Sequence, residues 1–203
     1  NVNAAEIGDP IWQPGPLDGG TSQDKIATLA DFVPLDKGQE PAVCQIAQTL
    51  AELLNTLANL TGSQHRLEAV QQTAGQNVMD VALARPDAPE LVTPEILDIG
   101  VPAGVGEPLL GMAVQKTGRT TGWTEGTIQQ IDVTVNVDYN GTPIWFTNQV
   151  FATSMSQPGD SGSAILDMER NVVGLLFAGS ERVTILTPIQ WILDELEANV
   201  VTA

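Results

Sequence analysis

The sequence predicts a mainly β protein built from short antiparallel strands. From residue 78 onward, short apolar segments alternate with turns rich in Gly, Pro and Asn, a pattern typical of a barrel or a sandwich. Tyr139-Asn140-Gly141-Thr142 contains an Asn-Gly pair, which supplies the positive φ angles of a hairpin turn. Helical periodicity is confined to residues 41–75 and to the C-terminal end of the chain.

Residues 1–36 predict short strands and turns. The segment from Ile7 to Gly15 is interrupted by Gly and Pro, whereas the apolar residues from Lys25 to Leu35 roughly alternate, as in a half-buried strand. Further strands are expected at 78–84, 112–117, 126–138, 144–153, 163–167, 171–178 and 182–187. The chain should end in a helix within 187–198, whose apolar face holds Ile189, Ile192, Leu193 and Leu196.

Residues 41–75 predict a helical hairpin. Pro41 suits the first turn of a helix, Thr61-Gly62 its end, and Ser63 the N-cap of a second, shorter helix. The apolar stripe of the first helix is expected to pack on the barrel or on the second helix, or alternatively to cover a cleft or join subunits. Cys44 is expected to be a small buried side chain. The stripe consists of Val43, Ile46, Ala47, Leu50, Leu53, Leu54, Leu57 and Leu60.

Composition excludes several classes of function. A formal net charge of -17 argues against nucleic-acid binding, which needs Lys and Arg to neutralise phosphates. Hydrophobic residues make up 42% of the chain, enough for a core, but no apolar run has the length of a membrane span. The single cysteine allows no internal disulfide. No zinc, calcium or phosphate-binding motif is present in the sequence, so no metal or cofactor is expected.

One segment has the residues expected around a nucleophilic serine. It is Gln157-Pro158-Gly159-Asp160-Ser161-Gly162-Ser163. A nucleophilic serine needs a tight turn with Gly, so that backbone N–H groups point at the oxyanion that develops during attack. An apolar strand follows this turn at once. Gly-Asp-Ser-Gly followed by a strand resembles the nucleophile motif of chymotrypsin-like serine peptidases.

The resemblance extends over most of residues 78–198. Residues 171–179 resemble the family's strand along the substrate cleft, 184–192 its final strand and C-terminal helix, and 116–126 the first strand and turn of its second barrel. It implies two six-stranded antiparallel barrels. The first, incomplete barrel would occupy residues 1–100 with the helical insertion at 41–75, and the second barrel with the C-terminal helix would occupy 101–203.

The resemblance also implies roles for individual residues in the cleavage of a peptide or protein substrate. Ser161 would be the nucleophile, and the amides of Gly159 and Ser161 would hold the oxyanion. Asp80-Val81-Ala82-Leu83 resembles the segment with the catalytic aspartate, and Asp80 precedes Ser161 by 81 positions where the family spacing is about ninety. The alternatives are a serine in an ordinary turn or on an inactive scaffold, and an aspartate at a strand edge.

The catalytic histidine is missing from this pattern. The only histidine, His65, lies 15 positions before Asp80 where the family spacing is about 45, and it falls in the second predicted helix. We therefore expect a truncated or processed product that is nearly inactive alone and has lost its histidine just before Asn1. Self-processing could leave the N-terminal fragment of the precursor as a partner. The alternative is a non-catalytic binding or assembly module, and either form could be an oligomer.

The resemblance further implies which residues form the primary substrate pocket. Its base lies six residues before the nucleophile, at Met155, and its walls would include Ser156 and Gly179. An apolar or modest-sized substrate side chain should fit there better than Lys or Arg.

Overall fold

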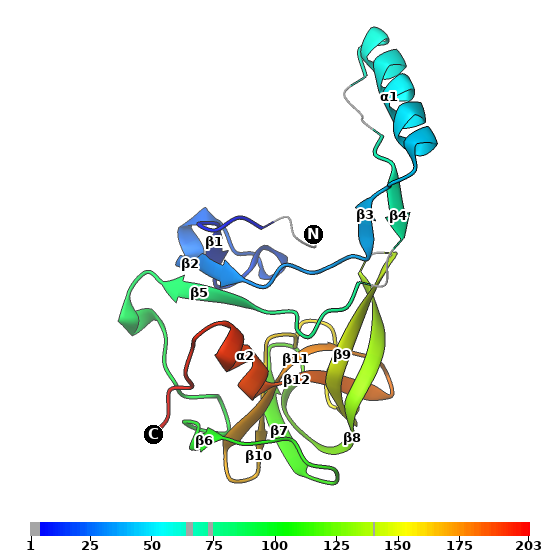
Figure 1. Ribbon diagram of the computed structural model, residues 1–203. Coiled ribbons are helices and arrows are strands. Elements are labelled where there is room, and N and C mark those ends of the chain that lie inside the picture. Colours follow the sequence, from blue (N-terminus) through cyan, green and yellow to red (C-terminus); the bar gives the residue numbers. More distant parts are fainter. Residues whose placement is uncertain (1–4, 64–66, 73–74, 140) are drawn as a thin grey trace.

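The structure is a computed structural model that describes residues 5–63, 67–72, 75–139 and 141–203. It is mainly β with a helix near the C-terminus (Figure 1), which confirms the predicted fold class. The chain forms a ring of strands, a smaller sheet beside the ring, and a two-stranded ribbon that leads to a protruding helix.

Strands β7 to β12 close into an antiparallel ring. Their order is β10-β7-β8-β9-β12-β11, and the ring closes because β10 also pairs with β11. The short β6 (Gly104–Val105) adds to β11 in parallel. The ring strands are β7 (Ala113–Gly118), β8 (Gly122–Tyr139), β9 (Thr142–Thr153), β10 (Ala164–Asp167), β11 (Asn171–Gly179) and β12 (Val183–Pro188).

Alternation of side chains fills the interior of the ring. Inward-facing residues such as Val114, Ile128 and Leu186 are almost completely buried, as the period of two along a strand requires. The predicted strands at 112–117, 126–138, 144–153, 163–167, 171–178 and 182–187 therefore correspond to β7 through β12. Residue 140 of the predicted hairpin turn lies outside the described residues, but β8 and β9 do form the hairpin.

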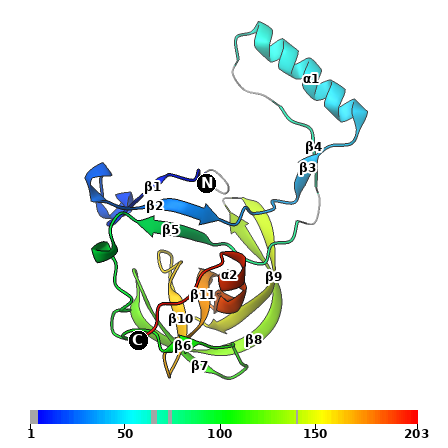
Figure 2. The same ribbon diagram turned by 60° about the vertical axis from the view of Figure 1, so that its left-hand side comes forward.

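The N-terminal half contributes a three-stranded sheet in the order β1-β2-β5 (Figure 2). The strand expected from Lys25 to Leu35 is β2, whereas that expected at 78–84 begins later, as β5. The elements are β1 (Pro10–Trp12), β2 (Lys25–Phe32), β5 (Ala82–Pro86) and the 3-10 helices η1 (Pro16–Asp18), η2 (Ser22–Asp24) and η3 (Pro89–Leu91).

A second core joins this half to the ring. Met79 and Val81 pack with Leu166 of β10, and with the helix α2 (Ile189–Glu195) through Ile189 and Ile192. Because the side chains on either side of Asp80 are held in this core, the segment that carries the aspartate is fixed against the strand that follows Ser161.

The predicted helical hairpin is wrong in its second half. One helix, α1 (Gln45–Leu60), is present, and the chain returns as a strand: β4 (Val70–Gln72) pairs with β3 (Gln39–Pro41). Pro41 therefore lies in β3 and not in a helical turn. The sequence after Ser63 has too few apolar residues in helical periodicity for a second helix, and the backbone of Leu67 instead bonds to the side chain of Asn55 in α1.

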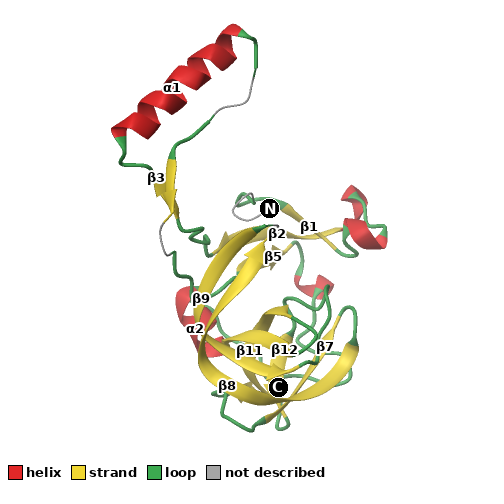
Figure 3. Cartoon of the chain, turned by 90° about the vertical axis from the view of Figure 1, so that its right-hand side faces the viewer, coloured by secondary structure: helices red, strands yellow, loops and turns green. Residues whose placement is uncertain are grey.

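The predicted packing of the helical stripe is also wrong. α1 has no buried residue and stands away from the rest of the molecule (Figure 3). Cys44, expected to be buried, is exposed. Sequence periodicity identifies an apolar face but not the surface that covers it, and here the described part of the same chain does not cover it. No helix in the described ranges is long and apolar enough to span a membrane.

Candidate active site

Ser161 lies exposed on the loop between β9 and β10. Glycines on both sides shape the turn: Gly159 has φ 102° and Gly162 φ 90°, conformations that favour glycine. The Ser161 hydroxyl donates a hydrogen bond of 3.2 Å to the carbonyl of Phe177 on β11. Among the described residues, the amides of Gly159 and Ser161 donate to no acceptor. Both N–H groups are therefore without an acceptor within this part of the chain, and their role at an oxyanion stays a prediction.

The residue before Ser161, Asp160, anchors this loop. Asp160 is fully buried, and its carboxylate accepts hydrogen bonds from the amides of Gln157 (2.9 Å), Thr120 (2.7 Å) and Thr121 (3.1 Å) and from the Thr121 hydroxyl (2.7 Å). Burial alone would raise the pKa of Asp160, but the hydrogen bonds from Gln157, Thr121 and Thr120 hold it well below its usual range.

The charge of Asp160 is compensated by Lys116 of β7. The ammonium lies 3.4 Å from Asp160 Oδ2, and both side chains are 0% exposed. Lys116 also donates to the Thr121 hydroxyl and to the carbonyl of Gly122 (3.2 Å). A Cβ at Gly118 would lie 2.4 Å from Asp160 Oδ1, so this glycine allows the close approach of β7 to the carboxylate. Sequence reasoning missed this pair, although a lysine inside the strand Ala113–Gly118 was a signal for a buried partner.

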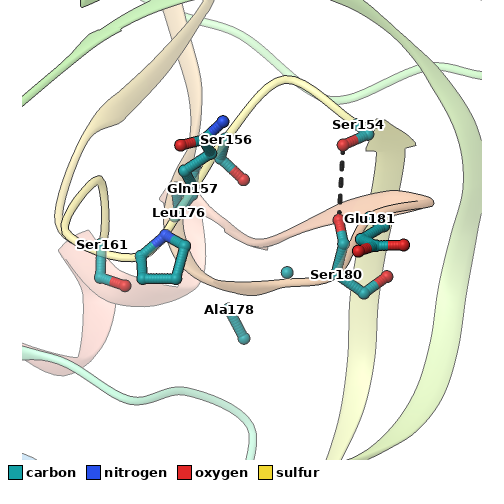
Figure 4. Close-up of a pocket in the computed structure, with 10 residues that line it drawn as sticks. Ser154, Ser156, Gln157, Ser161, Leu176, Ala178, Ser180 and Glu181 are labelled. Carbon is teal, nitrogen blue, oxygen red and sulfur yellow. Dashed lines mark hydrogen bonds between the residues drawn. The ribbon is translucent and has the colours of Figure 1, made fainter. Parts of the chain in front are cut away.

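A pocket of about 800 Å³ opens beside Ser161. Figure 4 shows Ser161 at one end, Ala178 in the middle, and Ser154, Ser180 and Glu181 at the other end. The strand predicted to line a substrate cleft, β11, contributes Leu176, Ala178 and Gly179 to it. Glu181, which the sequence analysis did not single out, places a carboxylate at the far end.

Two of the three predicted substrate-binding residues line this pocket, whereas Met155, predicted as its base, does not. Ser156 and Gly179 line the pocket, and the Ser156 hydroxyl shares a hydrogen bond of 2.8 Å with Thr184. The Met155 side chain packs in the core of the ring and is only 4% exposed. The backbone N–H of Met155 donates a hydrogen bond of 3.0 Å to the Thr184 hydroxyl. This bond fixes the backbone just before the pocket wall.

Asp80 lines a different pocket from Ser161, and two amide side chains fix the segment just before it. Asn77, which is 7% exposed, donates to the carbonyls of Asp36 (2.9 Å) and Trp145 (3.1 Å). Gln149 of β9 donates to the carbonyl of Val78 at 2.8 Å. These bonds tie the segment before Asp80 to β9. Sequence reasoning missed both residues, because neither belongs to a local motif.

The carboxylate of Asp80 accepts a hydrogen bond of 2.5 Å from the hydroxyl of Tyr139, at the tip of the β8–β9 hairpin. Only Oδ2 is engaged; Oδ1 has no donor among the described residues. Asp80 and Tyr139 line a pocket of about 520 Å³ whose other walls come mainly from apolar residues of the N-terminal sheet, including Leu29, Phe32 and Leu35. His65 lies outside the described residues.

We expect Tyr139 to resist ionisation in the folded protein. Burial, and then the hydrogen bond to Asp80 and its negative charge, raise the pKa of Tyr139 far above its usual value of 10.0. Tyr139 is the only tyrosine of the chain, so the tyrosinate absorbance reports this group directly. At about pH 11, where free tyrosine is mostly ionised, the folded chain should show little tyrosinate.

Asp80→Asn should lower the pKa of Tyr139 but leave it raised, since burial remains, and Asp138→Asn is the matched control. Because the folded pKa exceeds the unfolded one, the stability linked to Tyr139 is complete below about pH 10 and declines as the pH rises above it. Ionisation near pH 10 in a chain that circular dichroism shows to be folded would contradict this expectation.

The described residues contain no group of three or more His, Cys, Asp or Glu side chains placed to hold a metal ion.

Comparison with known proteins identifies the family. The trypsin family model matches residues 55–193. Protease A of Thermobifida fusca is 27% identical, with a TM-score of 0.52 over 61% of this chain and 69% of that chain. The Nocardiopsis protease shares the fold at 23% identity, with a TM-score of 0.52 over 61% of this chain and 68% of that one.

The Cellulomonas bogoriensis chymotrypsin is 28% identical, with a TM-score of 0.44 over 50% of this chain. The chain spans 55% of the length of that chymotrypsin. A search of curated protein sequences found no match to the chain of 203 residues. Because the family model covers more than half of the residues, and the ring and the loop of Ser161 lie within the match, this chain belongs to the trypsin family of serine proteases.

Proposed function

We propose that the chain carries the nucleophile, the oxyanion-binding amides and the aspartate of a serine endopeptidase that acts through an acyl-enzyme. The observation that carries the proposal is the loop of Ser161. Its exposed hydroxyl lies beside a pocket, the amides of Gly159 and Ser161 have no acceptor among the described residues, and the buried carboxylate of Asp160 anchors the turn. Such preorganised donors stabilise charge in the transition state without reorganising.

In the proposed reaction, Ser161 Oγ attacks the carbonyl carbon of the scissile peptide bond and its proton passes to an imidazole. The carbonyl oxygen becomes an oxyanion that accepts hydrogen bonds from the amides of Gly159 and Ser161. The imidazolium then gives its proton to the leaving amine, and water hydrolyses the resulting ester by the reverse sequence. Asp80 would orient the imidazole and stabilise its charged form.

We propose that the imidazole belongs to a histidine other than His65, supplied from outside these 203 residues, for example by the N-terminal fragment of one precursor. Two observations support room for it. Asp80 Oδ1 has no donor among the described residues, and the pocket of about 520 Å³ at Asp80 is open toward the incomplete N-terminal sheet. The Ser161 hydroxyl donates meanwhile to the carbonyl of Phe177, a bond that it must leave for the base.

The pocket beside Ser161 supports a preference for apolar or modest-sized substrate side chains. Leu176 and Ala178 offer apolar walls, and Ser156 and Gly179 leave room near the nucleophile. Met155, proposed for the pocket base, packs in the core of the ring. It would therefore support the pocket wall indirectly, through that core. A peptide library with strict cleavage after Lys or Arg would contradict the preference.

A fluorophosphonate probe tests the proposal. This chain, and a form extended upstream to include a histidine, are treated with the probe, and the labelled residue is found by mass spectrometry. We expect rapid labelling of Ser161 in the extended form, none in its Ser161→Ala variant, and slow labelling of the chain alone. Absence of labelling in both forms would instead support a non-catalytic binding module. The hydrogen bond from the Ser161 hydroxyl to the carbonyl of Phe177 would be compatible with that outcome, because it engages the hydroxyl.

A further inference from the structure

The helix α1 presents an apolar ridge that the described part of the chain leaves uncovered. The ridge side chains are from 40% (Leu54) to 80% (Val43 and Leu60) exposed. The ridge is formed by Ile46, Leu50, Leu53, Leu54, Leu57 and Leu60 of the helix, together with Val43, which precedes it. A contiguous apolar surface of this kind marks an interaction site. A helix of 16 residues is also only marginally stable in water without packing of its apolar face.

Backbone groups before and after α1, at Ala42 and Leu67, bind side chains on its opposite, polar face. Asn55 donates to the carbonyl of Leu67 at 2.8 Å and accepts from its amide at 2.7 Å, and Gln48 donates to the carbonyl of Ala42 at 2.6 Å. Gln48 and Asn55 are seven positions apart and share one side of the helix, while the ridge faces away from them. The ribbon β3–β4 then carries the helix clear of the ring (Figure 1).

The spacing of the ridge indicates another helix as its partner. Five of its residues within α1 follow one another at intervals of 4, 3, 4 and 3, the repeat of positions that meet a neighbouring helix in coiled coils and bundles. They are Ile46, Leu50, Leu53, Leu57 and Leu60. The flanking positions are uncharged: Ala47 and Leu54 on one side, Thr49 and Thr56 on the other.

Charge favours self-association over other partners. Glu52 is the only charged residue between Ala42 and Ser63, whereas the whole chain carries -17, so α1 is a nearly neutral element on an acidic protein. Two copies can join their helices while the ribbons keep the acidic bodies apart. A helix lying on a membrane surface would be expected to carry Lys or Arg on its polar face, and 42–63 has none.

The area of the ridge favours more than one neighbour per helix. Sixteen residues span about 24 Å, so one helix pair offers a contact strip on the order of 240 Å², below the roughly 800 Å² per partner of stable interfaces. Leu54 and Ala47 widen the ridge so that a helix can touch two neighbours. We propose that copies of this chain associate through a bundle of α1 helices with the ridge at its centre.

Light scattering combined with size-exclusion chromatography tests the proposal on the whole chain over a hundredfold range of concentration. A reducing agent is present, because exposed Cys44 could otherwise form disulfide dimers. We expect a mass that is a multiple of the single chain. Leu53→Glu should shift the midpoint of association at least tenfold to higher concentration with an unchanged melting temperature of the ring. Gln45→Glu, which adds the same charge outside the ridge, should not.

Two outcomes overturn the proposal. A chain that is monomeric throughout, with a lower melting temperature in Leu53→Glu, would mean that the ridge folds back onto its own ring. A chain that is monomeric throughout, with no effect of Leu53→Glu, would mean that the ridge meets a different partner. Neither outcome bears on the labelling of Ser161, so the two proposals fail separately.

Discussion

Replacement of Ser161 by alanine should lower kcat about 10⁶-fold in a form of the protein that contains the catalytic base, and only slightly in the chain of 203 residues. The residues of a catalytic triad act as a unit, and removal of one costs about as much as removal of all. A chain without the histidine retains only the acceleration that binding and the oxyanion amides provide, on the order of 10³–10⁴ over water.

Both forms should be assayed with the same activated ester, and with Ser22→Ala as a matched serine replacement on the remote helix η2. In the chain alone, the residual rate should rise steadily with pH, because hydroxide must replace the absent imidazole. If the extended form and its Ser161→Ala variant hydrolysed the ester at equal rates, Ser161 would be excluded as the nucleophile. A plateau near neutral pH in the chain alone would show that it already contains a base, and His65 would then need to be reconsidered.

Lys116→Met should destabilise the fold by about 3–5 kcal/mol, the cost of leaving a buried carboxylate without its partner. The pair of Lys116 and Asp160 is fully buried, so the loss cannot be relieved by water. Lys25→Met is the matched control. Lys25 lies 2.7 Å from Asp87, but both side chains are 38% exposed, and such pairs contribute about 0–1 kcal/mol. Urea unfolding of the two variants measures the difference.

The same substitution should reach the active site. Asp160 directs the turn that presents Ser161, so Lys116→Met should also slow the labelling of Ser161 in the extended form, whereas Lys25→Met should not. In the double variant Lys116→Met/Asp160→Asn, the two effects should be less than additive, because the carboxylate that lost its partner is removed too. A cost for Lys116→Met no larger than that for Lys25→Met would show that the hydrogen bonds to Asp160 suffice without the lysine.

The ring could be predicted from the sequence because its strands carry local signals. Alternation of apolar residues and turn residues such as Asn140-Gly141 act over a few positions, and they located β7 to β12 within a few residues. The loop of Ser161 could be predicted for the same reason, because the glycines that shape it lie within the motif itself.

What could not be predicted depends on contacts between distant residues. Tyr139 meets Asp80 across 59 positions, and Asp160 meets Thr121 across 39, so no window of sequence contains either pair. The apolar stripe of α1 was correctly identified, but periodicity cannot say whether a face is covered by the same chain. The prediction of a second helix was wrong because the expected cap at Ser63 is not followed by a sustained apolar face.

The long β8–β9 hairpin has a consequence for the rates of folding and unfolding. Its strands are adjacent in the chain, so they can pair early, whereas the bridge between Asn77 and Phe146 closes a span of 69 positions and should form late. Interactions that form after the folding transition state mainly slow unfolding. The time that Asp80 stays in its folded position should therefore depend on Asn77 and Gln149, and the speed of folding on the hairpin.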